Sequence, residues 1–343
     1  MEKILTVLIP VYNTEKYIQR CLDSLLLNET NDFVELLVVS DGSKDGSVDI
    51  VKKYQKKYPN TIKLVEKENG GHGSTINVGI KEANGKYFRV IDSDDWVNSV
   101  DFIKLVNKLK KEDSDLVVTN YSKEHVYSGV SEYIKYDKLE DNATYSFDKS
   151  LFEKLHGEYF VMATSTYKTS ILRDSKVKLM EKTFYVDMQY NLMPIKKVET
   201  ISFYDLDVYR YFIGRADQSV NTASFVRNKK DHEKVLRFMI DYFEDEKKNL
   251  SKTKHEYLKM IINYTLYTHY TILCTYDTDY KDAYEKIKTF DSYLKQKSPE
   301  LYLESNKMGF TRNHRKTGFF FVRRFRKIYS KSYTVLRKLK GGK

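Results

Sequence analysis

Three carboxylates lie within four residues at Asp92-Ser93-Asp94-Asp95, directly after an apolar run that ends at Ile91. Like charges this close repel one another unless water or a cation neutralises them. Hard oxygen ligands at the end of a buried strand suit Mg²⁺ or Mn²⁺, which takes one or two protein carboxylates and lets substrate phosphates complete its shell. The segment therefore predicts chemistry in which a divalent cation meets a phosphorylated substrate.

Three other polar segments also follow apolar runs: Pro10–Glu15, Ser40–Ser47 and Glu68–Ser74. Taken singly, each is equally well explained as a turn or a helix start. The glycine-rich run at Gly70-Gly71 lacks the Lys-Ser/Thr that a Walker loop needs. Their value lies in their occurrence together with the carboxylates.

The elements that must position these segments follow from apolar spacing. Short β-rich runs alternate with helical periodicity over the first 120 residues, which indicates an α/β fold with a mainly parallel sheet. In such sheets, ligands bind at the carboxyl ends of the strands. All four polar segments are expected at that edge. The strands are predicted at 4–9, 34–39, 62–65, 87–91 and 115–119.

In order and spacing, these motifs resemble the GT-A fold glycosyltransferases of family 2, an inverting group that uses nucleotide-diphosphate sugars. The resemblance covers about 100 residues. One departure is Ile76, which stands before Asn77 where many members have arginine, so that arginine's phosphate contact is not carried over. The matching residues are Pro10-Val11-Tyr12-Asn13, Asp41 to Ser47, Asn69-Gly70-Gly71, Asn77, Ala83-Asn84-Gly85 and Asp92-Ser93-Asp94-Asp95.

The resemblance implies a UDP-sugar donor. It places the uracil at the Pro10–Asn13 backbone and Asp41, the ribose near Asp92, and a Mn²⁺ or Mg²⁺ ion on Asp94, with Asp92 as a second metal ligand. The metal would stabilise the UDP leaving group. The full set of predicted nucleotide-sugar contacts is Pro10, Val11, Tyr12, Asn13, Glu15, Asp41, Asn69, Gly70, Asn77, Asp92, Ser93, Asp94, Arg210 and Arg215.

An inverting transfer also needs a base beside the acceptor hydroxyl. Family members supply it from an Asp in a Y-E-D-like segment, and Tyr185-Val186-Asp187 matches with Val in place of Glu. Asp187 is therefore the predicted base, and its alternative role is a helix-start acid favoured by the macrodipole. The segment from Tyr209 to Ser219 resembles the family's phosphate-closing motif. Gln218 and Ser219 belong to it, and for His72 a phosphate contact and a purely local role stay open.

The domain prediction is a catalytic domain at 1–220, with a nucleotide-binding part at 1–120 and an acceptor part at 121–220. A helical unit at 221–304 and a basic amphipathic tail at 305–343 follow. Thirteen of the 59 Lys and Arg residues lie in that tail, which has no acidic residue. Because apolar and basic residues fall on opposite faces of a helix over 318–340, the tail predicts contact with an anionic membrane surface. Docking on the protein itself and a solubilising tail are the alternatives.

Composition limits the class of protein, the roles of its cysteines and its cellular location. Hydrophobic residues make up 41% and charged residues 31% of the 343, which excludes a wholly disordered chain. Cys21 and Cys274 lack metal-ligand spacing and are expected to be buried thiols. With neither a signal peptide nor a membrane span predicted, we expect a cytoplasmic protein, peripheral on the inner face of the membrane, that acts on a glycan or lipid-linked acceptor. No nucleic acid partner is expected. A nucleic-acid binder that uses the tail and a catalytically silent sugar-nucleotide binder remain alternatives.

Overall fold

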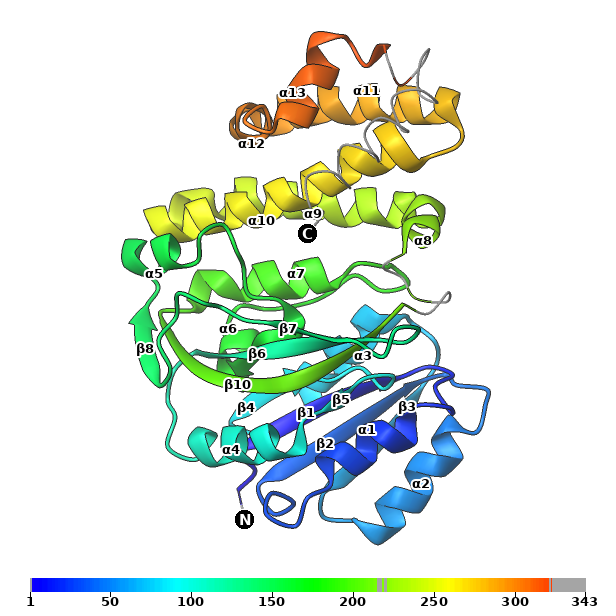
Figure 1. Ribbon diagram of the computed structural model, residues 1–343, viewed down its shortest axis with the longest axis vertical. Helices are drawn as coiled ribbons and strands as arrows, with labels where there is room; N and C mark the ends of the chain where they lie inside the picture. Colours follow the sequence, from blue (N-terminus) through cyan, green and yellow to red (C-terminus); the bar gives the residue numbers. More distant parts are fainter. Residues whose placement is uncertain (1, 215–217, 219–220, 321, 323–343) are drawn as a thin grey trace. The chain divides into compact units, whose positions relative to one another are not determined.

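The computed structural model describes residues 2–214, 218, 221–320 and 322. The chain divides into two compact units, Met1–Ala216 and Asp217–Lys343. The first is an α/β unit and the second is helical (Figure 1). The predicted fold class, a mainly parallel sheet followed by a helical C-terminal unit, is thereby confirmed.

Four parallel strands form one side of the sheet, in the order β3-β2-β1-β4. Every residue of β1, β2 and β4 is buried, as expected for strands covered on both faces. Because the strands are parallel, their carboxyl ends meet at one edge, and the loops that follow them lie there. The bounds are β1 (Leu5–Val11), β2 (Val34–Asp41), β3 (Ile62–Lys67) and β4 (Tyr87–Val90).

Helices cover both faces of these strands. The apolar stripes of α1, α2 and α4 share one core with alternate residues of β1 and β2. On the other face, α3 packs so closely that a side chain at Gly79 would meet the Leu8 side chain of β1 at 2.6 Å. The helices of this unit are α1 (Ile18–Leu25), α2 (Ser47–Lys57), α3 (His72–Glu82), α4 (Ser99–Leu109), α5 (Lys149–Lys154), α6 (Thr169–Asp174) and α7 (Asp187–Leu192).

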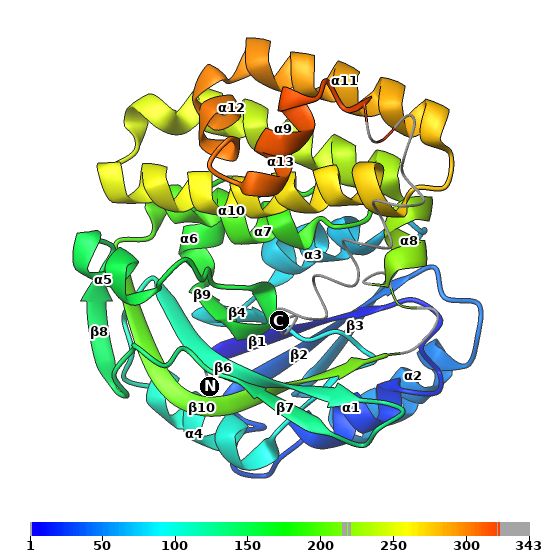
Figure 2. The same ribbon diagram turned by 45° about the horizontal axis from the view of Figure 1, so that its top comes forward.

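The sheet continues as β4-β9-β6-β10-β5, and here the pairing is mixed. The apolar residues at 200–204 and 207–212 predict two separate strands. In the structure they form one long strand, β10, whose register beside β6 shifts around Asp207. Figure 2 shows β10 curving beside β6. The bounds are β5 (Trp96–Val97), β6 (Leu116–His125), β7 (Ser131–Ile134), β8 (Ala143–Ser146), β9 (Ser165–Lys168) and β10 (Thr200–Ile213), with a 3₁₀ turn at Met162–Thr164.

The sequence from Phe184 to Ile195 predicts one helix, and the helix in the structure is shorter. It begins at Asp187 and ends at Leu192, and a 3₁₀ turn follows over Met193–Lys197. Pro194 explains the break, because proline has no N–H to donate and its ring displaces the preceding turn.

The second unit contains α8 (Thr222–Arg227), α9 (Lys229–Glu246), α10 (Lys252–Thr271), α11 (Tyr280–Lys297), α12 (Pro299–Ser305) and α13 (Gly309–Lys316), with a 3₁₀ turn at Lys247–Asn249 and a π turn at Ile272–Tyr276. Both cysteines are buried and free, as predicted. Within the described residues, no helix is long and apolar enough to cross a bilayer.

Arg315 ties the last described helix into this unit. Its guanidinium donates to Asp291 Oδ1 at 2.7 Å and to the Tyr270 hydroxyl at 2.9 Å. Phe319 and Val322 are also buried. The region predicted as a tail from residue 305 therefore begins inside the helical unit, and most of the predicted membrane segment at 318–340 lies outside the described residues.

Candidate active site

The loops after β1 and β2 are bonded to each other by their own motif residues. Asn13 Oδ1 accepts from the Lys44 N–H at 2.8 Å, and Glu15 Oε2 accepts from the Gly46 N–H at 3.0 Å. A side chain at Gly46 would meet Glu15 at 2.7 Å, which explains the glycine. Asn13 and Glu15, both predicted to contact the nucleotide, thus also fix the shape of this edge.

The exposure of the first loop changes abruptly after β1. Pro10 and Val11 are buried in the strand, whereas the side chain of Tyr12 is 51% exposed. Among the five residues predicted to line the uracil, Tyr12 and Asn13 are exposed, and Tyr12 is the aromatic one. A planar phenol ring is suited to stacking on a nucleobase.

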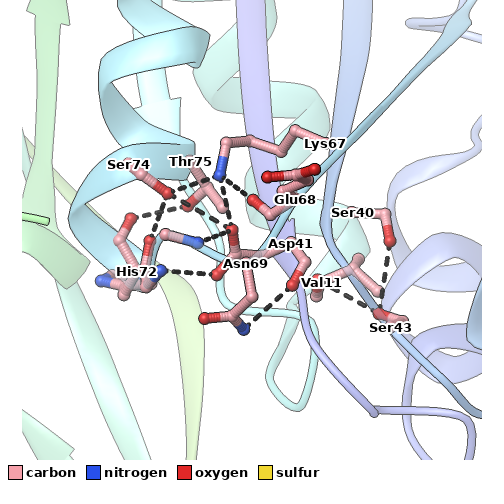
Figure 3. Close-up of polar contacts among 12 residues, drawn as sticks. Val11, Ser40, Asp41, Ser43, Lys67, Glu68, Asn69, His72, Ser74 and Thr75 are labelled. Atoms are coloured by element: carbon pink, nitrogen blue, oxygen red, sulfur yellow. Dashed lines mark hydrogen bonds and ion pairs between the residues drawn. The ribbon is translucent and has the colours of Figure 1, made fainter. Parts of the chain in front are cut away.

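The Asp41 carboxylate is the central acceptor of the glycine-rich loop (Figure 3). Oδ1 accepts from the Gly70 N–H at 2.8 Å, and Oδ2 accepts from the Gly71 N–H at 2.7 Å. The Asn69 amide donates to the Asp41 carbonyl at 3.0 Å. Asp41 is 3% exposed, so these bonds form where water competes little. The structure thus brings together Asp41, Asn69 and Gly70.

Lys67, at the end of β3, balances the Asp41 charge. Its ammonium lies 2.7 Å from Asp41 Oδ1 and 2.9 Å from Ser74 Oγ, and it also donates to the Glu68 carbonyl (Figure 3). Lys67 was not among the predicted site residues, because a single lysine at a strand end belongs to no recognisable motif. Its spacing from β2 could have suggested a partner for Asp41 only once strand order was known.

The carboxylates after β4 have different environments. Asp92 and Asp94 are half-buried, whereas Ser93 and Asp95 are buried. Asp95 accepts from the Tyr209 hydroxyl at 2.5 Å and from the Phe212 N–H at 2.8 Å. Burial, and then the charges of Asp94 and Asp92, raise the pKa of Asp95 well above its ordinary range. Asp95, which was not among the predicted site residues, joins the predicted metal motif to β10.

Arg20 of α1 supports the same motif from its backbone. Its guanidinium donates to the Asp94 carbonyl at 3.0 Å and lies 3.7 Å from the centre of the Trp96 ring. Phe212 packs edge-on against Trp96, with ring centres 5.6 Å apart. Trp96 therefore packs between the Arg20 guanidinium and the Phe212 ring.

His72 begins α3 and faces the metal motif. Its Nε2 lies 3.0 Å from Asp92 Oδ1. Burial lowers the pKa of His72, but the charges of Asp92, Asp187 and Asp94 outweigh that effect, and the pKa is raised overall. Ile76, which stands where many family members have arginine, is fully buried. His72 is the basic side chain of α3 that contacts Asp92.

Asp187 is the first residue of α7 and belongs to the same charged group. Burial raises the pKa of Asp187, and the opposite charge of His72 counteracts part of that increase. Asp92 adds to the increase. The predicted base and the predicted metal motif thus lie close enough for their charges to interact, although 93 sequence positions separate Asp187 from Asp94.

The remaining predicted contacts are partly engaged elsewhere. Arg210 forms ion pairs with Glu124 at 3.0 Å and Asp207 at 2.8 Å on the sheet. Asn77 bonds through both polar atoms of its side chain to the Leu179 backbone, at 2.8 and 2.9 Å. Arg215 and Ser219 lie outside the described residues. Gln218 is buried, and its carbonyl accepts from Asn221 and Ser224.

The donor set fits a divalent cation shared with a diphosphate. Among the described residues, no group of three or more His, Cys, Asp or Glu side chains is arranged to hold a metal ion. Asp92 and Asp94 supply two half-buried carboxylates, the number that Mg²⁺ or Mn²⁺ uses when phosphates complete the shell. A cage built from protein ligands alone does not fit these residues.

Comparison with known proteins gives the class. The family model described as glycosyl transferase family 2 matches residues 6–174. The uncharacterized glycosyltransferase MG060 homolog of Mycoplasma pneumoniae is 32% identical over 222 residues, which cover 63% of this chain and 71% of that protein. The chain therefore belongs to glycosyl transferase family 2.

Other relatives are matched over a smaller part. The putative glycosyltransferase EpsH of Bacillus subtilis is 41% identical over 36% of this chain and 35% of its own length. The poly(ribitol-phosphate) beta-glucosyltransferase of Bacillus spizizenii is 28% identical over 64% of this chain and 34% of its own length. The chain thus spans about a third of these two proteins.

The crystal structure of S. aureus TarS 1–349 has the same GT-A fold. It superposes with a TM-score of 0.64 at 18% identity, covering 96% of this chain and 91% of that one. At this identity the likeness concerns the fold, and it confirms the architecture that the motifs implied.

Proposed function

We propose that the protein is an inverting glycosyltransferase that moves a sugar from a UDP-sugar to a hydroxyl of a cell-surface glycan or a lipid-linked acceptor. The observation that carries the proposal is the charged group of His72, Asp92 and Asp187, drawn from two helix starts and a strand end. Family membership supports the reaction class. TarS structures determined with UDP and with UDP-GlcNAc support the donor class, and the poly(ribitol-phosphate) relative supports the acceptor class.

In the proposed reaction, the acceptor oxygen attacks the anomeric carbon as its proton passes to the Asp187 carboxylate. The bond between that carbon and the diphosphate oxygen breaks, and its electron pair leaves with UDP. Asp187 suits this role because burial favours its protonated form, which raises its affinity for the proton. Mn²⁺ or Mg²⁺, when held by Asp94 and Asp92, would supply charge stabilisation for the leaving diphosphate.

The donor half of the proposal assigns the base and ribose to the edge formed by the first two loops. Tyr12 would stack on the uracil, and Asp41 would hold the glycine-rich loop in place beside the nucleotide through its bonds to the Gly70 and Gly71 N–H groups. Arg210 and Arg215 remain proposed phosphate contacts, because a guanidinium fork matches phosphate oxygens. Arg210 would then exchange its present carboxylate partners for the substrate.

Thermal unfolding tests the donor half. UDP, GDP and CDP would each be added with and without Mn²⁺ to the intact protein and to Asp94→Asn. Ligand at 100 times its Kd stabilises by about 2.7 kcal/mol, which raises Tm by several degrees. A rise specific to UDP with Mn²⁺ and lost in Asp94→Asn is expected, and no rise with any nucleotide would reject the donor assignment.

Product analysis tests the transfer half. UDP-glucose and UDP-GlcNAc would be supplied with poly(ribitol-phosphate), and the anomeric configuration of the product determined by NMR. Inversion is expected. Nucleotide binding without transfer to this or to lipid-linked acceptors would favour a silent sugar-nucleotide binder.

We also propose that the protein acts at the cytoplasmic face of the membrane, through the basic residues of 318–340. The sequence supports this, because each basic side chain near an anionic surface contributes about 1 kcal/mol. Sedimentation with phosphatidylglycerol vesicles should fall when Arg323, Arg324, Arg326 and Lys327 are changed to Gln, and not when Lys52, Lys53, Lys56 and Lys57 are changed. Equal losses in both variants would reject a specific membrane segment.

A further inference from the structure

The segment between α6 and α7, residues 175–186, is held in an unusual backbone conformation. Lys176, Lys182 and Tyr185 have φ values of 53°, 48° and 64°. Residues other than glycine seldom adopt this left-handed backbone region, because their Cβ atom comes too close to a carbonyl oxygen. Such strain persists only where surrounding contacts impose it, and it concentrates near functional sites. This segment leads directly into Asp187.

The contacts that impose this conformation come from the middle of α3 and from the glycine-rich loop before it. Asn77 Nδ2 donates to the Leu179 carbonyl at 2.9 Å, and its Oδ1 accepts from the Leu179 N–H at 2.8 Å. The Lys182 N–H donates to the Gly70 carbonyl at 2.5 Å. One side-chain amide and one glycine carbonyl thus bond to three backbone groups of the segment.

The glycines of the motif allow this close approach. A Cβ at Gly71 would lie 3.0 Å from the Lys182 nitrogen, and one at Gly73 would overlap the Met180 carbonyl. Gly71 also has a φ of 81°. The spacing of these glycines therefore matches the path of the segment as well as the shape of the loop around Asp41.

The next residue passes the restraint on to α7. The Met180 N–H donates to Oε1 of Gln189 at 3.0 Å, and Gln189 is fully buried two positions after Asp187. Consecutive residues, Leu179 and Met180, are therefore bonded to α3 on one side and to α7 on the other. These bonds connect α7, which begins at Asp187, with α3, which begins at His72.

We propose that Asn77 is a positioning residue for the base, acting together with Gln189, and that it holds Asp187 at the donor site through Leu179 and Met180. This inference rests on the proposed function for its catalytic consequence, since it takes Asp187 as the base. Its structural part stands independently. The proposal gives Asn77 a role other than the nucleotide contact that the family resemblance implied.

Hydrogen–deuterium exchange of the full chain tests the structural part without any substrate. Asn77→Ala is expected to speed exchange of the amides over 179–187, while amides of β1 and β2 keep their protection. Asn77→Asp provides a second variant of nearly the same volume: it keeps the acceptor for the Leu179 N–H and replaces the donor to the Leu179 carbonyl with an acceptor oxygen. Asn107→Ala, an exposed asparagine of α4, is the matched control. Unchanged exchange over 179–187 in both Asn77 variants would overturn the proposal.

Release of UDP from UDP-glucose or UDP-GlcNAc tests the catalytic part. Asn77→Ala is expected to lower kcat about 10²-fold, the size of effect that an ångström of misplacement causes, with the Kd for UDP unchanged. In an Asp187→Asn background the same change should cost nothing further. Multiplicative losses in the double variant, or a weaker UDP affinity with unchanged kcat, would overturn the positioning role.

The two proposals fail in different ways. Normal UDP release by Asp187→Asn would reject the base assignment whatever Asn77 does. Gln189→Met, which keeps the volume and removes the acceptor, should reproduce the kcat loss of Asn77→Ala with the same UDP affinity. A Gln189→Met protein with normal kcat would restrict positioning to α3 alone and overturn the part of the proposal that assigns Gln189.

Discussion

Two regions of the α/β unit reach left-handed backbone conformations by different means. The motif loops use glycine at Gly42 and Gly71, where φ is 72° and 81°, and asparagine at Asn13, where φ is 53°. The segment before the proposed base uses lysine and tyrosine, and tertiary bonds hold it in place. The first arrangement leaves a mark in the sequence, because glycine adopts such angles at little cost and asparagine tolerates them better than most residues. The second leaves none, because its cause lies on another helix.

The largest effect is expected at the residue that the second region positions. Asp187→Asn should lower transfer by about 10²- to 10⁴-fold, the usual contribution of a general base, while UDP binding persists. Because burial raises the pKa of Asp187, the acidic limb of kcat should lie at a higher pH than for an ordinary aspartate. Pre-steady-state transfer assays across pH would measure both. Glu181→Gln, an exposed acid of the same segment, serves as control.

A change in the first region should damage the second. Gly73→Ala places a methyl group against the Met180 carbonyl and should displace the segment that leads to Asp187. We expect a loss in kcat of about tenfold to 10²-fold. Steady-state kinetics would measure it, with Gly309→Ala as control, because a Cβ there meets nothing closer than 3.9 Å. Wild-type kcat in Gly73→Ala would show that the two regions are independent.

The ion pair within the motif loops should affect stability. Asp41→Asn leaves the Lys67 ammonium without its counter-ion and weakens the bonds to Gly70 and Gly71. The Lys67 side chain is 23% exposed, so water recovers part of the loss, and about 2 kcal/mol is expected. Urea unfolding would measure it. The adjacent exposed pair of Lys52 with Glu66 is the control, and Glu66→Gln should cost under about 1 kcal/mol.

The smallest effect is expected when glycine replaces a residue with positive φ in the segment before Asp187. Lys182→Gly places a glycine at a left-handed position of residues 175–186, as already occurs in the motif loops. It should stabilise the protein by about 0.5–1 kcal/mol, because the left-handed strain is relieved. Lys178→Gly, nearby and without a positive φ, should instead destabilise by about the same amount. Differential scanning calorimetry would rank the two. Equal destabilisation would mean that Lys182 carries no strain.

The sequence allowed the central sheet to be predicted because β1, β2 and β4 are mainly apolar and rich in β-branched and aromatic residues. It did not reveal β9, whose four residues Ser165–Lys168 are too short and polar to form a pattern. The residues of the candidate site likewise differ in how well the sequence predicts them. Asp41 and Asp94 were recognisable from local motifs, whereas the partner of Asn77 lies 102 positions away. Long-range hydrogen bonds of this kind become visible only once α3 and α7 have been placed.

One family motif lies at the opposite end of the sheet from the site. Glu35 accepts from the Asn84 side chain at 2.6 Å and from the Thr6 hydroxyl at 2.6 Å, and that hydroxyl accepts from the Gly85 N–H at 2.8 Å. Under the proposed function, a genetic screen for lost surface polymer would score changes at Gly85 and at Asp94 alike. Their protein yields would differ, because the first change lowers the amount of folded enzyme and the second leaves a full complement of inactive molecules. Soluble abundance would therefore sort the variants from such a screen into the two kinds.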